Sequence, residues 1–279
     1  MIRILIPTDF SENAWNAIKY GMELLKGREC VIYLSYIQVK PVFIAAESTI
    51  TANTPELRDQ ILKERKRNLE DLILRIRDLG LDGNHTLATL ANTGLFVDGI
   101  KSQIEDYKID LIIMGTRGAS GLKKITIGSN TGNVITRVKC PVLVVPENAV
   151  YEELKEIVFP TDYQINYDLK VLEILVSLLK KYRANLRILH IATQSKDLTS
   201  EQEKHKELLH EYLNGASHTF HTLRGTSVET SLQCFIESRD IQLAVMVAKN
   251  LNFLQRILFR PIVEKFSYHT EIPFLVLHE

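Results

Sequence analysis

The chain has 279 residues, of which 45% are hydrophobic and 24% charged, and its 34 basic residues balance 34 acidic ones. These values are typical of a packed globular protein and argue against disorder, collagen-like repeats and coiled coils. A net charge of zero gives no electrostatic reason to expect nucleic acid or an anionic membrane as a partner.

The apolar runs are short, and the cysteines are few. No run reaches the 18 residues of a membrane span, and the first is too short for a signal peptide. Cys30, Cys140 and Cys234 lie too far apart for a zinc site, so we expect thiols that behave as small buried hydrophobes in a reducing compartment. The expected location is the cytoplasm.

In the first half of the chain, short apolar runs alternate with stretches whose apolar residues recur at helical spacing. Ser11 is expected to cap the first helix, and Gly80 to end the second. The predicted strands are 2–6, 31–37, 86–90, 109–114 and 142–145, and the predicted helices are 11–26, 56–79, 95–107 and one that starts near 129.

The second half repeats this order. The opening Ile4-Leu5-Ile6-Pro7-Thr8-Asp9 returns as Ile157-Val158-Phe159-Pro160-Thr161-Asp162, and a closing Cys140-Pro141-Val142-Leu143-Val144-Val145 returns as Ile272-Pro273-Phe274-Leu275-Val276-Leu277. The predicted strands are 156–159, 186–192, 217–223, 242–247 and 274–277, and the predicted helices are 168–182, 201–213, 227–237 and 262–268.

Near-continuous apolar strands that alternate with helices predict a parallel sheet covered on both faces. The fold class is therefore α/β, with two tandem five-stranded sandwich domains at 1–147 and 152–279. The last strand of each repeat is apolar throughout, and such an edge needs a cover. We predict that strands 142–145 and 274–277 pair, which makes the two repeats an internal pseudo-dimer. The sequence does not determine whether two chains form a further homodimer.

Small residues follow the fourth strand of the first repeat, where ligands of open α/β sheets bind. Gly115, Gly118, Gly121 and Gly128 fall within fourteen residues, and Ser129 opens a helix. Glycine lets backbone N–H groups approach an anion, and a helix N-terminus favours phosphate. The spacing is neither a P-loop nor the dinucleotide-binding fingerprint.

Ile-Pro-Thr-Asp-Phe-Ser, Met-Gly-Thr-Arg-Gly, the spacing G-x2-G-x9-G-S and Cys-Pro-Val-Leu-Val-Val together resemble the universal stress proteins. The resemblance is that of a tandem member, and it is strongest in the first half. It implies an adenine-nucleotide-binding α/β fold of the adenine nucleotide alpha hydrolase-like kind, with ATP held by the glycine motif. Mg²⁺ could accompany ATP, and ADP or AMP are alternative ligands.

The resemblance also implies the site residues. Asp9 and Ile37 would lie at the adenine and ribose, Gly115 and Gly118 along the ribose and first phosphate, and Gly128, Ser129 and Asn130 at the distal phosphates. The full set of candidate binding residues is Thr8, Asp9, Ile37, Met114, Gly115, Arg117, Gly118, Gly128, Ser129, Asn130 and Thr131. Asp9 could instead, or in addition, serve the start of the helix.

The second repeat lacks this motif. In an ungapped alignment, Val247 replaces Gly115, Asn250 replaces Gly118, and Arg260 and Pro261 replace Gly128 and Ser129. Proline also removes an N–H donor. We therefore predict one nucleotide site per chain.

The histidines do not suggest a metal site. His218 and His221 would point to opposite faces of a strand, and His205 and His210 miss the spacing of a zinc pair on a helix. His190 is expected in the core or at a strand end. The loop 39–55 is long enough for a lid over the adenine.

The expected function is that of an ATP-binding stress sensor or regulator. Hydrolysis should be slow or absent, because no general base is evident beside the phosphates. A nucleotide-free scaffold of the same fold is the alternative. An enzyme of the adenylyl-transfer group would need a histidine-rich phosphate motif that Pro7-Thr8-Asp9-Phe10 does not supply.

Overall fold

The computed structural model describes residues 1–39, 55–116, 128–164, 167–192, 197–225, 227–248 and 272–278. The predicted helix 262–268 and nearly all of the predicted lid 39–55 lie outside these ranges. Arg117 and Gly118 of the glycine motif lie outside them as well.

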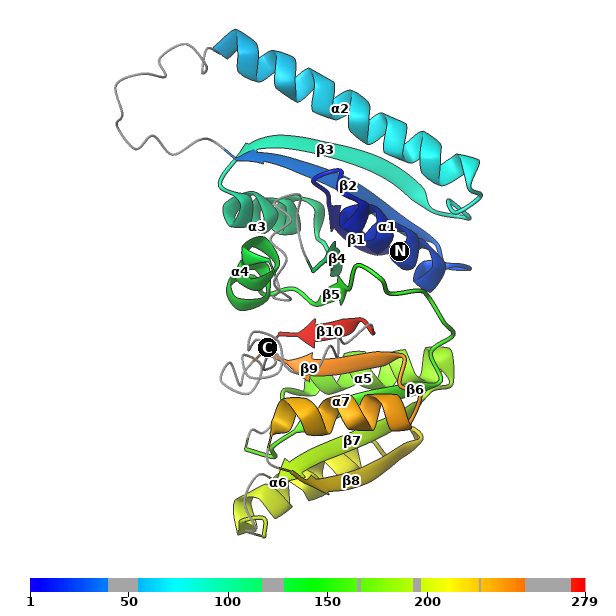
Figure 1. Cartoon of the computed structure of the whole chain (residues 1–279), viewed down its shortest axis with the longest axis vertical. Coiled ribbons are helices and arrows are strands. Elements are labelled where there is room, and N and C mark those ends of the chain that lie inside the picture. The colour runs from blue at the N-terminus through cyan, green and yellow to red at the C-terminus, as the bar shows by residue number, and fades with distance from the viewer. Residues whose placement is uncertain are drawn as a thin grey trace, which may run out of the picture. The chain divides into compact units, whose positions relative to one another are not determined.

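The described residues form ten strands and seven helices in an alternating order (Figure 1). In the first repeat these are β1 Ile2–Pro7, α1 Glu12–Leu25, β2 Cys30–Val39, α2 Pro55–Asp78, β3 Thr86–Gly94, α3 Phe96–Tyr107, β4 Leu111–Gly115, α4 Ser129–Arg137 and β5 Val142–Val145. In the second they are β6 Glu156–Thr161, α5 Leu169–Tyr182, β7 Asn185–Ala192, α6 Ser200–Tyr212, β8 His218–Arg224, α7 Val228–Ser238, β9 Leu243–Val247 and β10 Phe274–Leu277. The predicted α/β class with mostly parallel strands is confirmed.

The chain divides into two compact units. In the first, the strands follow the order β3-β2-β1-β4, and all of them run parallel. Right-handed crossovers on such an order put α1 and α2 on one face and α3 and α4 on the other. In agreement, the Arg75 guanidinium of α2 lies 3.8 Å from the ring centroid of Trp15 in α1, and α3 contacts α4. The β1 residues Ile4, Leu5 and Ile6 are fully buried between the two layers.

In the second unit the order is β5-β10-β9-β6-β7-β8. Strands β6, β7, β8, β9 and β10 are parallel, as in the first repeat. The β6 residues Ile157, Val158 and Phe159 are fully buried, as are their counterparts in β1. The second repeat therefore builds the same central strands from a different sequence.

The last strands of the two repeats pair with each other, as predicted. Strand β5 runs antiparallel to β10, with Val144 opposite Phe274 and Val142 opposite Val276. All eight residues of these two strands are buried. Because of this ladder, β5 groups with the second compact unit although it closes the first repeat. The domain limits 1–147 and 152–279 stay a prediction.

Helices α1, α5 and α7 each follow a side chain that caps their first turn, and at α1 this is the predicted cap Ser11. The Ser11 hydroxyl accepts a hydrogen bond from the Ala14 amide, Asp168 accepts one from Lys170, and Ser227 accepts one from Thr230. These bonds satisfy N–H groups that the first helical turn leaves without an intrahelical partner. Gly80 follows α2 in the left-handed region, with φ of 63°.

Candidate functional site

The loop that joins β1 to α1 is held by the side chains of Thr8 and Asp9. Thr8 is buried, and its Oγ1 accepts a hydrogen bond of 3.0 Å from the Phe10 amide. Asp9 Oδ1 accepts bonds of 3.1 Å and 2.6 Å from the amide and hydroxyl of Ser11. Phe10 has a φ of 65°, a left-handed conformation that is uncommon for a bulky residue. Asp9 therefore does serve the helix start, and it stays exposed at the edge of the sheet.

A cation–aromatic cluster covers this loop. The rings of Phe10 and Tyr36 lie 5.3 Å apart, and the Arg65 guanidinium of α2 is 5.7 Å from each centroid. Such contacts stabilise by about 0.5–1 kcal/mol at exposed sites and more when desolvated. They fix the position of the Phe10 ring, next to Asp9 in the chain.

Two of the predicted binding residues, one of them expected at the adenine and ribose end, are buried. Ile37 in β2 is 7% exposed, and its Cδ1 lies 2.9 Å from the place where a Cβ on Gly99 would be. Its side chain therefore packs against the first turn of α3. Met114, the penultimate residue of β4, is 5% exposed. A role of Ile37 at the adenine, and of Met114 in nucleotide binding, stays a prediction.

Gly115 is required by packing within the first repeat. A Cβ on Gly115 would lie 1.9 Å from Oδ1 of Asn13, in the first turn of α1. Asn13 is 6% exposed, its Nδ2 donates to Thr116 Oγ1 at 3.3 Å, and its Oδ1 is buried without a hydrogen-bond partner among the described residues. Sequence reasoning missed Asn13, because the contact joins residues 103 positions apart.

Helix α4 starts at the same edge of the sheet. The Gly128 amide donates to the Thr116 carbonyl at 2.6 Å, and the buried Thr131 hydroxyl donates to the Gly115 carbonyl at 2.8 Å. Gly128 is the N-cap residue and supplies no side-chain hydrogen bond to the helix. Ser129 and Asn130 follow it and are exposed. The structure thus brings the start of α4 to the end of β4.

The predicted site residues that the structure describes fall into three groups. Gly115, Gly128 and Thr131 come together through β4 and α4, while the Thr8 amide bonds to the Ser35 carbonyl of β2, and Asp9, Ser129 and Asn130 are exposed at the adjoining loops. Ile37 and Met114 are buried behind this edge. Arg117 and Gly118 lie outside the described residues, as do the basic loop residues Lys123 and Lys124.

In the second repeat, aromatic side chains pack at the corresponding edge. The Tyr163 amide donates to Thr161 Oγ1 at 3.0 Å, and Tyr163 has a φ of 54°. Tyr163 thus corresponds to Phe10 of the first repeat, and Thr161 to Thr8. Tyr163 is 2% exposed and stacks on His190, with centroids 5.2 Å apart. Burial raises the pKa of the Tyr163 phenol, and the nearby Glu203 adds to this effect. His190 is buried within β7, in agreement with the expectation of a core position, and Val247 ends β9 where Gly115 ends β4.

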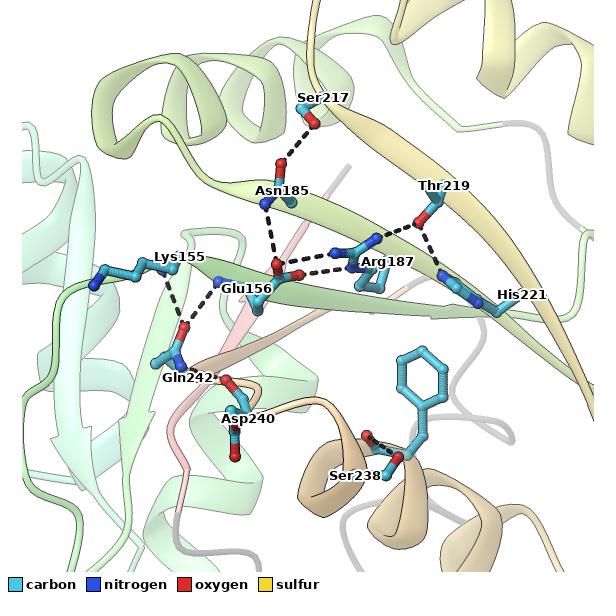
Figure 2. A network of polar contacts seen from close by, with 11 residues as sticks. Lys155, Glu156, Asn185, Arg187, Ser217, Thr219, His221, Ser238, Asp240 and Gln242 are labelled. Carbon is cyan, nitrogen blue, oxygen red and sulfur yellow. Dashed lines mark hydrogen bonds and ion pairs between the residues drawn. The ribbon is translucent and has the colours of Figure 1, made fainter.

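A second polar cluster lies at the amino ends of β6, β7 and β8 (Figure 2). Arg187 holds both carboxylate oxygens of Glu156, at 2.6 Å and 2.9 Å, and also donates to Thr219 at 2.9 Å. Asn185 donates to Glu156 at 3.0 Å. Burial would raise the pKa of Glu156, but the bonds from Arg187 and Asn185 and the charges of Arg187 and Arg239 together lower it.

His221 completes this cluster. Burial and the positive charges of Arg239 and Arg187 lower the pKa of His221, and its Nε2 lies within hydrogen-bond distance of the Thr219 hydroxyl oxygen, at 2.8 Å. These side chains hydrogen-bond to one another across β6, β7 and β8, and we assign the cluster a structural role in tying the three strands together.

In the part of the chain that the structure describes, no helix is long and apolar enough to cross a membrane. Nor do those residues bring together three or more histidine, cysteine or acidic side chains as metal ligands.

The comparisons with known proteins agree with this architecture. The model of the universal stress protein family matches residues 1–146. The universal stress protein MJ0577 of Methanocaldococcus jannaschii is 31% identical over 156 residues, which are 51% of this chain and 93% of that protein. The universal stress protein MJ0531 of the same organism is 32% identical over 145 residues, which are 51% of this chain and 81% of that protein.

The fold similarity extends over the whole chain. The crystal structure of a universal stress protein from Archaeoglobus fulgidus covers 99% of this chain and 98% of its own, with a TM-score of 0.69 and 19% identity. At that identity the likeness shows the fold alone. From the family match and the relatives together, the chain belongs to the universal stress protein family.

Proposed function

We propose that this protein binds one ATP per chain in its first repeat and acts as a stress-response sensor or regulator. ADP and AMP would bind the same site, and Mg²⁺ would accompany ATP. The proposal rests on the family membership and on the geometry at the carboxyl ends of β1 and β4.

The start of α4 carries the proposal. Its N-cap is a glycine without a side-chain cap, and the 2.6 Å bond from Gly128 to Thr116 fixes it at the end of β4. The first-turn N–H groups of a helix bind anions, and the helix dipole adds to the attraction. Ser129 and Asn130 place an exposed hydroxyl and an exposed carboxamide beside these amides. A triphosphate is the ligand that such a set of donors suits best.

Asp9 supports the assignment of the nucleoside end. It is exposed beside the buried Thr8, at the end of the strand next to β4. A carboxylate accepts hydrogen bonds from ribose hydroxyls or from an adenine amino group.

Slow hydrolysis follows from where Asp9 lies in the site and from the hydrogen bonds that it already accepts. Its Oδ1 already accepts from the Ser11 amide and hydroxyl. A general base must reach the attacking water, and Asp9 belongs to the nucleoside end of the site. We expect phosphate release from ATP to be far slower than nucleotide exchange.

The second repeat is proposed to act as a structural partner without a nucleotide. Tyr163 and His190 fill its β6–β7 edge, and Val247 stands where a glycine would be needed. We therefore expect one bound nucleotide per chain.

Isothermal titration with ATP, with and without Mg²⁺, tests the proposal on the parent chain, Gly128→Val and Thr136→Val. Gly128 has φ of −56°, which valine tolerates, so the change should block approach to the helix start without straining the backbone. Thr136 is exposed in the last turn of the same helix and serves as the control. We expect at least tenfold weaker binding for Gly128→Val alone. Equal affinities in all three chains would refute the phosphate site.

A nucleotide-free scaffold is the second candidate, and one observation favours it. Gly115 makes room for Asn13, and Thr131 bonds to the Gly115 carbonyl, so two motif residues have packing roles without any ligand. Absence of binding by ATP, ADP and AMP in the same titrations would select this candidate.

A further inference from the structure

Histidine is concentrated in the second repeat. Seven of the eight histidines follow residue 151. Two of them, His210 and His218, meet across the short connection between α6 and β8. Nδ1 of His210 lies 2.9 Å from Nε2 of His218, and the ring centroids are 5.0 Å apart. His221 faces Phe235 of α7 instead, which confirms that His218 and His221 point to opposite faces.

The fold brings the two rings together in a way that spacing along one element does not reveal. His210 lies in the last turn of α6, and His218 is the first residue of β8. Between them, Gly215 turns the chain with φ of 92°. Phe220 packs edge-on against both imidazoles, with centroids 5.8 Å and 5.7 Å away.

The hydrogen bonds of His218 define which of its nitrogens carries a lone pair. Its Nδ1 lies 2.9 Å from the Ala216 carbonyl oxygen, which only accepts, so Nδ1 carries the proton. In the neutral ring Nε2 is then an acceptor, and it points at His210. A backbone carbonyl on the second nitrogen is the usual outer-shell partner of a metal-binding histidine, because it fixes the tautomer and the ring orientation.

The separation of the two nitrogens matches that of metal ligands. Two imidazole nitrogens that each lie about 2.0–2.1 Å from one ion are about 2.9 Å apart at a right angle and about 3.3 Å apart at the tetrahedral angle. The observed 2.9 Å therefore equals the nitrogen separation at a square or octahedral ion, and the two rings need only rotate so that their lone pairs point to the ion. Zn²⁺ requires in addition a small opening of the pair. The negative end of the α6 dipole adds attraction for a cation at this place.

We propose that His210 and His218 form a binding site for one divalent transition-metal ion, with Cu²⁺ preferred over Ni²⁺ and Zn²⁺. On binding, the proton on His210 Nδ1 leaves to water while Nε2 of the same ring takes one up, so that His210 stays neutral and the lone pairs of His210 Nδ1 and His218 Nε2 both turn to the metal. His210 is exposed, so water completes the coordination. The described residues supply no third histidine, cysteine or carboxylate, which makes this an open site of two protein ligands. The preference follows the general order of affinity of divalent metals for nitrogen ligands.

Titration of the tag-free full chain with Cu²⁺, and then with Zn²⁺, in a non-coordinating buffer tests the proposal. We expect one high-affinity Cu²⁺ per chain and at least tenfold weaker binding in His210→Gln and in His218→Gln. His221→Gln is the control from the same strand, and its affinity should change less than twofold. Electron paramagnetic resonance of the Cu²⁺ complex should show nitrogen coupling that is lost in both pair variants.

Imidazole NMR of the parent chain gives a readout that needs no substitution. Traces of Cu²⁺ should broaden the His210 and His218 signals before those of the other histidines. The proposal fails if broadening starts elsewhere, if no ion binds, or if His210→Gln and His221→Gln weaken binding equally.

Discussion

At the scale of single residues, Gly115 and Asn13 show how a motif glycine can serve packing and ligand binding together. The Asn13 carboxamide occupies the space that any side chain at position 115 would need. It also spans from α1 to Thr116, where the glycine loop begins. A change at Gly115 would therefore disturb the fold as well as a ligand.

Gly115→Ala should lower the free energy of unfolding by about 1–3 kcal/mol, the usual cost of an extra methyl group in a packed interior. Because the clash is with Asn13, Asn13→Ala should recover at least half of this loss when the two changes are combined. Urea unfolding of the two single variants and the double variant measures the coupling. Strictly additive losses would show that Asn13 is not the cause.

The three cysteines should differ sharply in reactivity. Burial, and then the negative charge of Asp110, raises the pKa of Cys140 to about 12, and Cys30 is 1% exposed. Cys234 is exposed on α7. Since the thiolate is the reactive form, native protein treated with iodoacetamide at pH 8 should be alkylated at Cys234 alone. Peptide mass spectrometry reads the sites, and labelling of Cys140 in the folded chain would contradict this account.

At the scale of elements, the Glu156–Arg187 pair ties β6 to β7. The Glu156 side chain is 20% exposed and that of Arg187 is 22% exposed. In the nearby pair of Glu153 and Lys155, each side chain is 72% exposed. Pairs as exposed as Glu153–Lys155 contribute little, because water and salt screen them.

Arg187→Met should cost about 1–3 kcal/mol at pH 7, because a partly buried carboxylate loses its charged donors. The pKa of Glu156 is lowered in the folded state, so its contribution is present above the unfolded pKa of about 4.3 and is lost as the pH falls through the folded pKa. The cost should therefore shrink by pH 3.

Thermal unfolding of Arg187→Met and of Glu153→Gln at both pH values measures this dependence. Glu153→Gln should change stability by less than about 0.5 kcal/mol throughout. A cost of Arg187→Met that is the same at pH 3 and pH 7 would rule out the charge of Glu156 as its source.

The bounds of the strands show which features of an element the sequence predicts. Strands β5 and β10 were predicted to the residue, because Pro141 and Pro273 precede short apolar runs. By contrast, β3 was predicted to end at residue 90 and continues to Gly94. Ala91, Asn92 and Thr93 carry no apolar pattern, and only pairing with β2, up to Val39 opposite Gly94, keeps them extended.

The candidate site, like the strands, was predictable where it depends on local sequence. The glycine positions, the helix start at Ser129 and the Thr8-Asp9 loop follow from local sequence. The Asn13–Thr116 bond and the His210–His218 pair do not, because each joins side chains from different elements whose register only the folded chain sets.

At the scale of the whole molecule, the β5–β10 ladder joins the ends of the two repeats. Two apolar edge strands cover each other in it, which removes an aggregation liability. Hydrogen exchange should find the amides of 142–145 and 274–277 in one slowly exchanging group that opens together. Rapid, independent exchange of either strand would show that the ladder does not form.

At this scale, the first repeat alone is proposed to hold a nucleotide, at the start of α4. Native mass spectrometry of the chain with saturating ATP counts the bound ligands directly. We predict one ATP per parent chain and per Thr136→Val chain, and a clear loss of ATP from Gly128→Val when the ATP concentration only just saturates the parent. Two nucleotides per chain, none on the parent, or one retained by Gly128→Val would contradict this prediction.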